Sequence, residues 1–132
     1  MQFDSNILIL FISNTLNEEL VDLLKLEIIK GNAYISRIVL IEVTAFSEYD
    51  DNRVKEIESF ILKYFKIIDI NSNIARLSAK LIRYKKIKTG KKFKLTDAII
   101  AATSIVKDQL LLTLDKEDFK DIEDLKLFKN KL

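Results

Sequence analysis

The sequence contains no cysteine, histidine, proline or tryptophan, and only two glycines among its 132 residues. Without cysteine, the chain has no disulfide framework and no thiolate metal site. Without histidine, it also lacks the usual catalytic base, which excludes Ser-His triads, Cys-His pairs and histidine-ligated zinc. A metal bound by this chain must therefore be held through oxygen atoms, which favours Mg²⁺ or Mn²⁺.

Long apolar runs are missing as well. The longest ones, such as residues 7–12, have about six residues, whereas a membrane-spanning helix needs about 20. Asp4 interrupts the first residues and no basic segment precedes the apolar run, so the start does not resemble a signal peptide. We therefore expect a cytoplasmic protein with no membrane segment. The length, the 48% hydrophobic content and the lack of linker composition predict one domain over residues 1–132.

The charges are distributed unevenly, although the net charge is only +2. Residues 71–95 contain nine of the 22 basic residues and none of the 20 acidic ones, so the remainder of the chain is acidic. A basic block in an otherwise acidic chain is typical of a protein that binds a polyanion. The alternative is that the block is only a solvated helix face followed by a flexible loop.

Four carboxylates lie beside apolar stretches that we expect to be buried: Asp4, Glu42, Asp97 and Asp115. A buried acid is costly unless it is paired, hydrogen-bonded or bound to a cation. We therefore predict that the fold gathers the four acids into one negative pocket that binds a hard divalent cation. Each acid also has a simpler explanation: a turn at Asp4, an exposed helix position at Glu42, a favourable helix dipole at Asp97, or a turn or helix cap at Asp115.

Strand and helix patterns alternate along the chain. Residues 7–12 either extend the first strand or begin a helix, because periodicity cannot decide between the two. The alternation predicts an α/β fold, a three-layer α/β/α sandwich with a central, mostly parallel sheet. Strands are expected at residues 1–4, 33–36, 66–70, 110–113 and 125–128, and helices at 17–30, 37–48, 53–65, 72–87, 116–122 and from a Thr96 cap to about 109.

The predicted topology also suggests the chemistry of the acids. Ligands bind beyond the carboxyl ends of parallel strands, where Asp4 and Asp115 are expected. Clustered carboxylates raise one another's pKa, and a divalent cation removes this repulsion. A bound Mg²⁺ would activate water and stabilise both a phosphoryl oxygen and the leaving oxygen, which suits phosphodiester hydrolysis.

The motifs around the acids resemble those of PIN-domain ribonucleases, in particular the small VapC-like toxin branch. The resemblance spans essentially the whole chain and keeps the order and spacing of four motifs. In this sequence they are Asp4-Ser5-Asn6 before an apolar stretch, Ser36 with Glu42 six residues later, Asp97-Ala98-Ile99-Ile100-Ala101-Ala102, and Thr113-Leu114-Asp115 followed by Asp118-Phe119.

The resemblance implies a PIN-like fold and a metal-dependent endoribonuclease that cleaves RNA, with Mg²⁺ or Mn²⁺ as cofactor. It also implies the toxin role in a type II toxin-antitoxin pair, a cognate antitoxin as partner, and a homodimer. By the same resemblance, Asp4, Glu42 and Asp97 would hold the first ion, and Asp115 would complete the site or assist a second ion. Asn6 and Thr113 would orient carboxylates or waters, and Asp118 could share the role of Asp115.

The basic block agrees with an RNA substrate. Arg83, Lys91, Lys92 and Lys94 would bind its phosphates, and this kind of contact depends on salt and selects weakly for sequence. Two aromatic side chains of this region, Tyr84 and Phe93, could stack on bases, although we favour core packing for both. The alternative function is a non-catalytic PIN-like module that binds RNA or a protein, and cleavage of DNA also remains open.

Overall fold

The computed structural model describes residues 1–46 and 48–129. Its central sheet has four parallel strands in the order β3-β2-β1-β4, with bounds β1 Gln2–Phe3, β2 Tyr34–Ser36, β3 Lys66–Ile68 and β4 Leu111–Leu112. The described residues also form seven helices: α1 Ser5–Ile12, α2 Glu18–Lys30, α3 Arg37–Thr44, α4 Asp51–Tyr64, α5 Ser72–Thr89, α6 Leu95–Val106 and α7 Lys116–Phe119.

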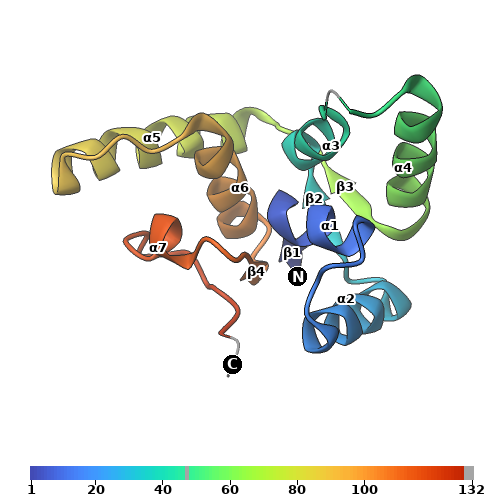
Figure 1. Cartoon of the computed structure of the whole chain (residues 1–132). Helices are drawn as coiled ribbons and strands as arrows, with labels where there is room; N and C mark the ends of the chain where they lie inside the picture. The colour runs from blue at the N-terminus through green and yellow to red at the C-terminus, as the bar shows by residue number, and fades with distance from the viewer. Residues whose placement is uncertain (47, 130–132) are drawn as a thin grey trace.

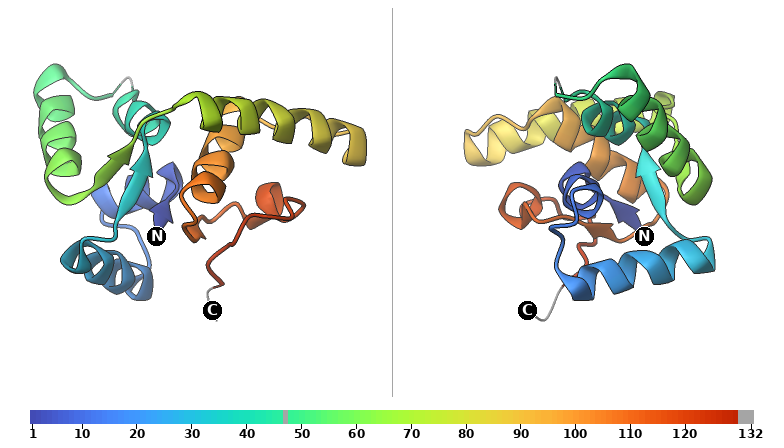
Figure 2. Two further views of the ribbon diagram at one scale, coloured as in Figure 1. Left: turned by 180° about the vertical axis from the view of Figure 1, so that it is seen from behind. Right: turned by 45° about the vertical axis from the view of Figure 1, so that its right-hand side comes forward.

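Helices cover both faces of the sheet, so the predicted α/β/α sandwich is confirmed. Figures 1 and 2 show α5 and α6 on one side of the sheet and α4 on the other. The side chains of β1 alternate accordingly. Phe3 packs edge-on against Phe65 at 6.1 Å between ring centroids, whereas the side-chain amide of Gln2 donates a hydrogen bond to the carbonyl of Ile100 in α6 at 2.9 Å.

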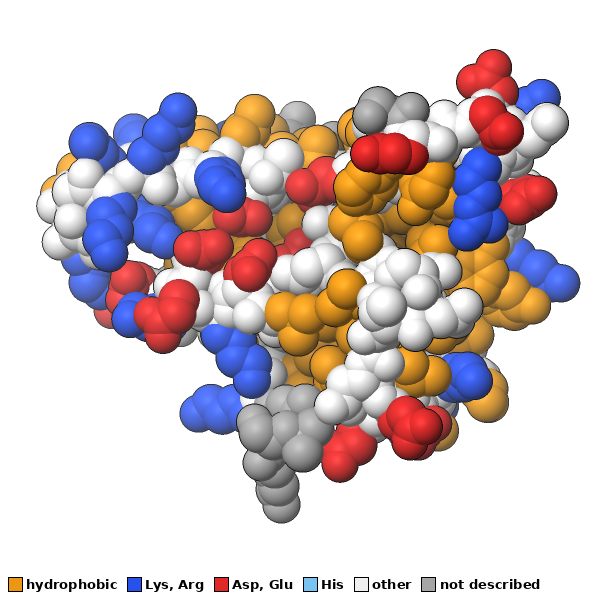
Figure 3. Space-filling model, viewed as in Figure 1, with side chains coloured by type: hydrophobic (Ala, Val, Ile, Leu, Met, Phe, Trp, Pro, Cys, Tyr) orange, Lys and Arg blue, Asp and Glu red, His pale blue; other side chains and the backbone are white. Residues whose placement is uncertain are grey.

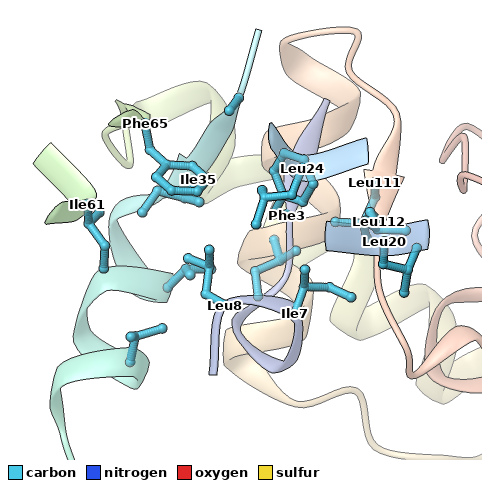
Figure 4. Packing of buried hydrophobic residues seen from close by; sticks show 14 of the residues in the cluster. Phe3, Ile7, Leu8, Leu20, Leu24, Ile35, Ile61, Phe65, Leu111 and Leu112 are labelled. Atoms are coloured by element: carbon cyan, nitrogen blue, oxygen red, sulfur yellow. The ribbon is translucent and has the colours of Figure 1, made fainter. Parts of the chain in front are cut away.

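The hydrophobic core lies between these layers and is built largely from residues that are inaccessible to solvent. Figure 4 shows side chains from α1, α2 and the strands pointing toward one another around Phe3. A second, smaller cluster joins β3 to α5 and α6 through Ile68, Ile74, Ile99 and Ala102. The core therefore fixes the sheet and its helices as one frame, from which the polar residues at the strand ends project.

Two side-chain caps begin the helices that follow the central strands. Asp4 Oδ1 accepts a hydrogen bond from the Ser5 amide at 2.8 Å and so begins α1 directly after β1. Ser36 Oγ accepts from the Ile38 amide at 3.3 Å and begins α3 directly after β2. These short connections leave no loop between strand and helix, so both helices start at the carboxyl edge of the sheet.

The structure decides between the two alternatives left open for residues 7–12 and corrects the expected start of α6. Residues 7–12 belong to α1 and do not extend β1, because the Asp4 cap turns the chain into a helix. The expected Thr96 cap is wrong, since Lys94 occupies the N-cap position of α6 and forms no side-chain capping bond. Thr96 lies inside the first turn of that helix. No helix in the described part of the chain is both long and apolar enough to cross a bilayer.

Several elements are shorter than expected. Helix α3 ends at Thr44 where the pattern predicted residue 48, and residue 47 lies outside the described residues. Helix α7 ends at Phe119 and not at residue 122. The strand expected at 125–128 is reduced to a single bridge between Leu127 and Leu111. The segment after α7 still packs on the core through Ile122, Leu125, Leu127 and Phe128, although it forms little regular structure.

Candidate active site

The sheet order places the ends of β1 and β4 side by side. Gln2 is in register with Leu111 and Phe3 with Leu112, so two segments at opposite ends of the chain pair in parallel. The chain passes from β1 to β2 and β3 in one direction and returns to place β4 on the other side of β1. In an open α/β sheet, the crevice at such a reversal of strand order is the usual ligand site.

Asp4 lies at this crevice, directly after β1, with only 3% of its surface exposed. Thr113 Oγ1, which follows β4, donates a hydrogen bond to Asp4 Oδ2 at 2.7 Å, and the Ser5 amide donates to Oδ1. Burial raises the pKa of Asp4, these hydrogen bonds oppose the rise, and the charge of Asp115 adds to it. The fold thus buries an acid that it stabilises only partly.

A small hydrogen-bond network connects Asp4 to Asp115. Asn6 Nδ2 lies 3.4 Å from Thr113 Oγ1 and donates to Asp115 Oδ2 at 3.2 Å. The same Thr113 hydroxyl accepts the amide of Asp115 at 3.0 Å, and Asn6 Oδ1 accepts the amide of Leu114 at 3.4 Å. Asn6 and Thr113 therefore hold the Asp115 carboxylate beside Asp4 and fix the turn that follows β4.

Glu42 reaches the same place from α3, which begins after β2, the other neighbour of β1. Its Oε1 atom is buried and has no hydrogen-bond partner among the residues that the structure describes. Burial raises the pKa of Glu42, and the charges of Asp4 and Asp97 raise it further, while a contact with the Ser5 hydroxyl and the charge of Lys94 lower it. A carboxylate oxygen that is buried without a partner is energetically costly. A bound cation would supply the missing partner of this atom.

Asp97 completes the group from the first turn of α6. Burial raises the pKa of Asp97 to about 6, and the charges of Asp4, Asp118 and Asp115 contribute to the rise. The structure therefore brings Glu42 and Asp115 each within electrostatic reach of both Asp4 and Asp97. Asp118, an exposed residue of α7, reaches only the Asp97 side of the group, whereas Asp115 reaches both Asp4 and Asp97.

The chemistry of the group fits a hard divalent cation. Its donors are all oxygen atoms, one of them is buried without a partner, and three of the carboxylates have raised pKa values. Within residues 1–46 and 48–129, however, no three acidic side chains are arranged so that they could hold a metal ion as they stand. Mutual repulsion keeps unneutralised carboxylates apart, so binding of a cation would require side-chain rotations that draw them together.

The basic residues border this acidic group on one side. Figure 3 shows acidic side chains between the Lys and Arg side chains that cover α5 and the region of α7. Lys94 lies close enough to lower the pKa of both Glu42 and Asp97, and Lys91 has the same effect on Glu117. Arg83 and Lys92 are exposed, and none of the hydrogen bonds or ion pairs between described residues joins them to the acids.

The two aromatic residues of the basic block have different environments. Phe93 is buried at 2% exposure, which agrees with core packing, whereas Tyr84 is 56% exposed and the expectation of core packing is wrong there. The ammonium of Lys80 lies 5.3 Å from the Tyr84 ring centroid. Tyr84 belongs to α5, a helix that extends beyond the sheet (Figure 2).

Sequence reasoning missed two residues that shape the group. The Ser5 hydroxyl contacts the carboxylates of Asp4 and Glu42, and only its place between Asp4 and Asn6 could have indicated this. Lys85 Nζ donates to the carbonyl of Asp118 at 2.6 Å and so ties α7 to α5. No sequence signal points to that contact, because it joins a side chain to a backbone atom across two separate elements.

The chain matches known proteins over nearly its whole length. The sequence model of the PIN domain family matches residues 1–125. A toxin-antitoxin complex from Klebsiella pneumoniae contains a chain that is 30% identical, with 94% of this chain and 93% of that chain covered and a TM-score of 0.72. No curated protein matches the chain.

Two further solved structures are similar in fold at lower identity. VapBC2 from Rickettsia felis, bound to a DNA fragment from its promoter, contains a chain with a TM-score of 0.80, 22% identity and 96% coverage of both chains. FitAcB from Neisseria gonorrhoeae contains one with a TM-score of 0.76, 23% identity and coverage of 97% and 96%. Because the matches include β1, β4 and the helices between them, the same sheet edge exists in these structures.

The raised pKa of Asp97 predicts that this acid destabilises the metal-free protein at neutral pH. A carboxyl whose pKa is higher in the folded state favours folding while protonated, so its contribution is lost as pH rises through about 6. In EDTA at pH 7.5, Asp97→Asn should therefore raise Tm by a few degrees, limited by the partial exposure of the group. The gain should shrink toward pH 4, which thermal melts across that range would measure.

The matched control is Asp69→Asn. Asp69 is an exposed acid whose pKa is held below its usual range by Arg37, with 2.6 Å between Nε and Oδ1. Removing its charge should leave Tm unchanged or lower it, the opposite sign to Asp97→Asn. A lower Tm for Asp97→Asn at pH 7.5 would mean that Asp97 makes net favourable contacts and is not held at a cost.

Proposed function

Because the chain belongs to the PIN-domain family, we propose that it is an endoribonuclease that requires Mg²⁺ or Mn²⁺. Proteins of this family are generally nucleases that use divalent ions. The observation that carries the proposal is the convergence of Asp4, Glu42 and Asp97 at one sheet edge, each with a raised pKa. The fold holds these three acids together at a cost in stability, and one buried carboxylate oxygen has no partner among the described residues. A bound cation would offset this cost, which suits a metal-dependent activity.

In this proposal, Asp4, Glu42 and Asp97 hold the ion, and Asp115 completes the site. We favour Asp115 over Asp118 as the fourth acid because Asn6 and Thr113 hold its backbone and carboxylate beside Asp4. When bound, the ion supplies activation of water and stabilisation of the leaving oxygen. Asn6 and Thr113 then act by fixing the direction of two carboxylates, as hydrogen-bonding neighbours of metal ligands commonly do.

The RNA would approach over the basic side of the acidic group. Arg83, Lys91, Lys92 and Lys94 are all exposed and available to bind phosphates. Their charges would offset the repulsion between the carboxylates and a polyanionic substrate, which a site lined only with acids could not attract. Binding through phosphates predicts weak sequence preference, so the choice of target would depend on RNA shape and accessibility.

We also propose that the protein is the toxin of a type II toxin-antitoxin pair, with a cognate antitoxin as partner and a homodimer as its own state. Support for this role comes from the toxin-antitoxin complex of Klebsiella pneumoniae, which contains a chain that is 30% identical over 94% of this one. An antitoxin would restrain a nuclease that otherwise cuts RNA of the same cell, which agrees with a place in the cytoplasm.

The second candidate function is a non-catalytic PIN-like module that binds RNA or a protein. One observation favours it: among residues 1–46 and 48–129, the acids are not arranged to hold a metal ion without side-chain movement. The raised pKa values favour the nuclease, because a module that only binds gains nothing from acids kept close together. Metal-independent RNA binding, without cleavage in any divalent ion, would support the second candidate.

Purified protein should cleave RNA from a panel of structured molecules in Mg²⁺ or Mn²⁺, with the products measured on denaturing gels. EDTA should abolish cleavage because the ion is removed, and Asp4→Asn and Asp97→Asn should each reduce it to background because a ligand is lost. Asp22→Asn, which changes an exposed acid of α2, should leave cleavage unchanged. Cleavage that persists in EDTA or in both site variants would contradict the metal-dependent mechanism.

Thr113→Val should lower the rate of RNA cleavage by roughly 10- to 100-fold, the usual effect of removing a group that orients a metal ligand. The change keeps the shape of the side chain but removes the donor to Asp4 and the acceptor for the Asp115 amide. Thr113→Ser, which retains the hydroxyl, should keep most of the activity. Equal rates for Thr113→Val and the unchanged protein would mean that the hydroxyl plays no part in orienting Asp4.

Induced expression in a bacterial host without the cognate antitoxin should arrest growth, because uncontrolled RNA cleavage stops protein synthesis. Growth curves with Asp97→Asn should be normal at equal protein levels, and Asp69→Asn should still cause arrest. If the protein cuts RNA in vitro but never slows growth, it is a nuclease without a toxin role. Arrest by the Asp97→Asn protein would instead point to toxicity that does not depend on cleavage.

A further inference from the structure

Lys94 differs from the other residues of the basic block by its position at the acidic group. It is the N-cap residue of α6, and its carbonyl accepts the first hydrogen bond of that helix from the Ala98 amide at 2.9 Å. Asp97 follows three residues later, and residues with this spacing lie on one side of a helix. Helix α3, which carries Glu42, packs against α6. Lys94 therefore begins one of two packed helices that each contribute an acid.

The position of Lys94 is fixed by its neighbour Phe93. That ring is buried at 2% exposure, packs edge-on against Phe119 at 6.1 Å between centroids, and lies 4.5 Å from the ammonium of Lys85. A buried aromatic residue directly before the cap holds the backbone in place, so Lys94 always enters the site region from the same point. Lys92 also adjoins Phe93, but it precedes the ring in the segment between α5 and α6, whereas Lys94 follows the ring and caps α6.

The ammonium of Lys94 forms no partnership that would explain its presence. Within residues 1–46 and 48–129, it takes part in none of the ion pairs or side-chain hydrogen bonds. It nevertheless lies close enough to Glu42 and Asp97 to lower the pKa of both. A positive charge close to these acids weakens the binding of a divalent ion there by repulsion. A role in holding the metal therefore does not account for the position of Lys94.

We propose that Lys94 binds a non-bridging oxygen of the phosphodiester group that is cut and stabilises the negative charge that develops there. The proposal rests on the nuclease function proposed above and adds a residue that acts on the substrate and not on the metal. A phosphate bound beside the acids would be the anionic partner that this lysine otherwise lacks. Preorganised cations aimed at developing charge are among the strongest contributors to phosphoryl chemistry.

The test compares the unchanged protein with Lys94→Ala, Lys94→Arg and Lys107→Ala. Lys107 is the matched control because it is an exposed lysine at the C-cap of the same helix, one helix length away from the acids. Three quantities are measured for each protein: kcat and KM on the RNA that is cut best at saturating Mn²⁺, RNA affinity in EDTA at several salt concentrations, and Mg²⁺ affinity by calorimetry without RNA. Circular dichroism melts verify that each variant is folded.

For Lys94→Ala, we expect kcat/KM to fall by roughly 10- to 100-fold at saturating metal, mainly through kcat, as for loss of a charged hydrogen bond. The slope of log affinity against log salt should decrease by about 0.7 to 0.9, the value for one phosphate contact. Mg²⁺ should bind the RNA-free variant as tightly as before or more tightly, because a repelling charge is gone. Lys94→Arg should recover part of the activity, and Lys107→Ala should match the unchanged protein in all three measurements.

Two results would overturn the proposal. One is a rate for Lys94→Ala within about twofold of the unchanged protein, since a contact to the reacting phosphate must cost more than this. The other is a loss of activity that excess metal restores together with weaker Mg²⁺ binding, which would assign Lys94 to support of the acids. If the unchanged protein and Lys107→Ala also fail to cut RNA, the nuclease function itself falls and Lys94 falls with it.

Discussion

Parallel pairing of β1 with β4 is the constraint on which the acidic group depends. Each strand has only two residues. Two backbone hydrogen bonds join them: the Gln2 backbone amide donates to the Leu110 carbonyl at 2.7 Å, and the Asp4 backbone amide donates to the Leu112 carbonyl at 3.0 Å. The Thr113 hydroxyl extends this contact by one side-chain bond to Asp4. Because β2 pairs on the other side of β1, Glu42 enters the same space from α3. A small number of backbone bonds thus determines where Asp4, Glu42 and Asp115 lie.

The acids themselves work against the fold. Burial and mutual repulsion raise the pKa values of Asp4, Glu42 and Asp97, so their ionised forms destabilise the native state near neutral pH. The buried apolar residues on both faces of the sheet supply the stability that offsets this cost. The apolar core therefore offsets the stability that is lost at the acidic group, as is common where a protein gives up stability for a functional site.

Much of this arrangement could be predicted from the sequence, because parallel α/β folds place strand ends at one edge. Asp4 and Asp115 follow apolar segments, and their expected positions at strand ends follow directly from that pattern. The family resemblance, carried by the spacing of four motifs, agrees with the PIN domain match. The roles of the individual residues stay predictions, since neither the fold nor the family match tests them.

Other features could not be predicted, for identifiable reasons. An apolar run such as residues 7–12 fits a strand or a helix equally well, and only the capping bond of Asp4 decides for α1. Thr96 looked like a helix cap by residue type, but the cap of α6 is Lys94, two residues earlier and directly after the buried Phe93 ring. The contact of Lys85 with the Asp118 carbonyl depends on tertiary packing that leaves no trace in local sequence.

The wide separation of the acids along the polypeptide has a consequence for protein synthesis. A ribosome makes Asp4 well before β4, which positions Thr113 against it and emerges more than a hundred residues later. A nascent chain that stops before β4 holds no assembled group of acids, however well α1 to α4 have already packed. The chemistry of this sheet edge thus becomes available only once the ribosome has made β4 as well as β1.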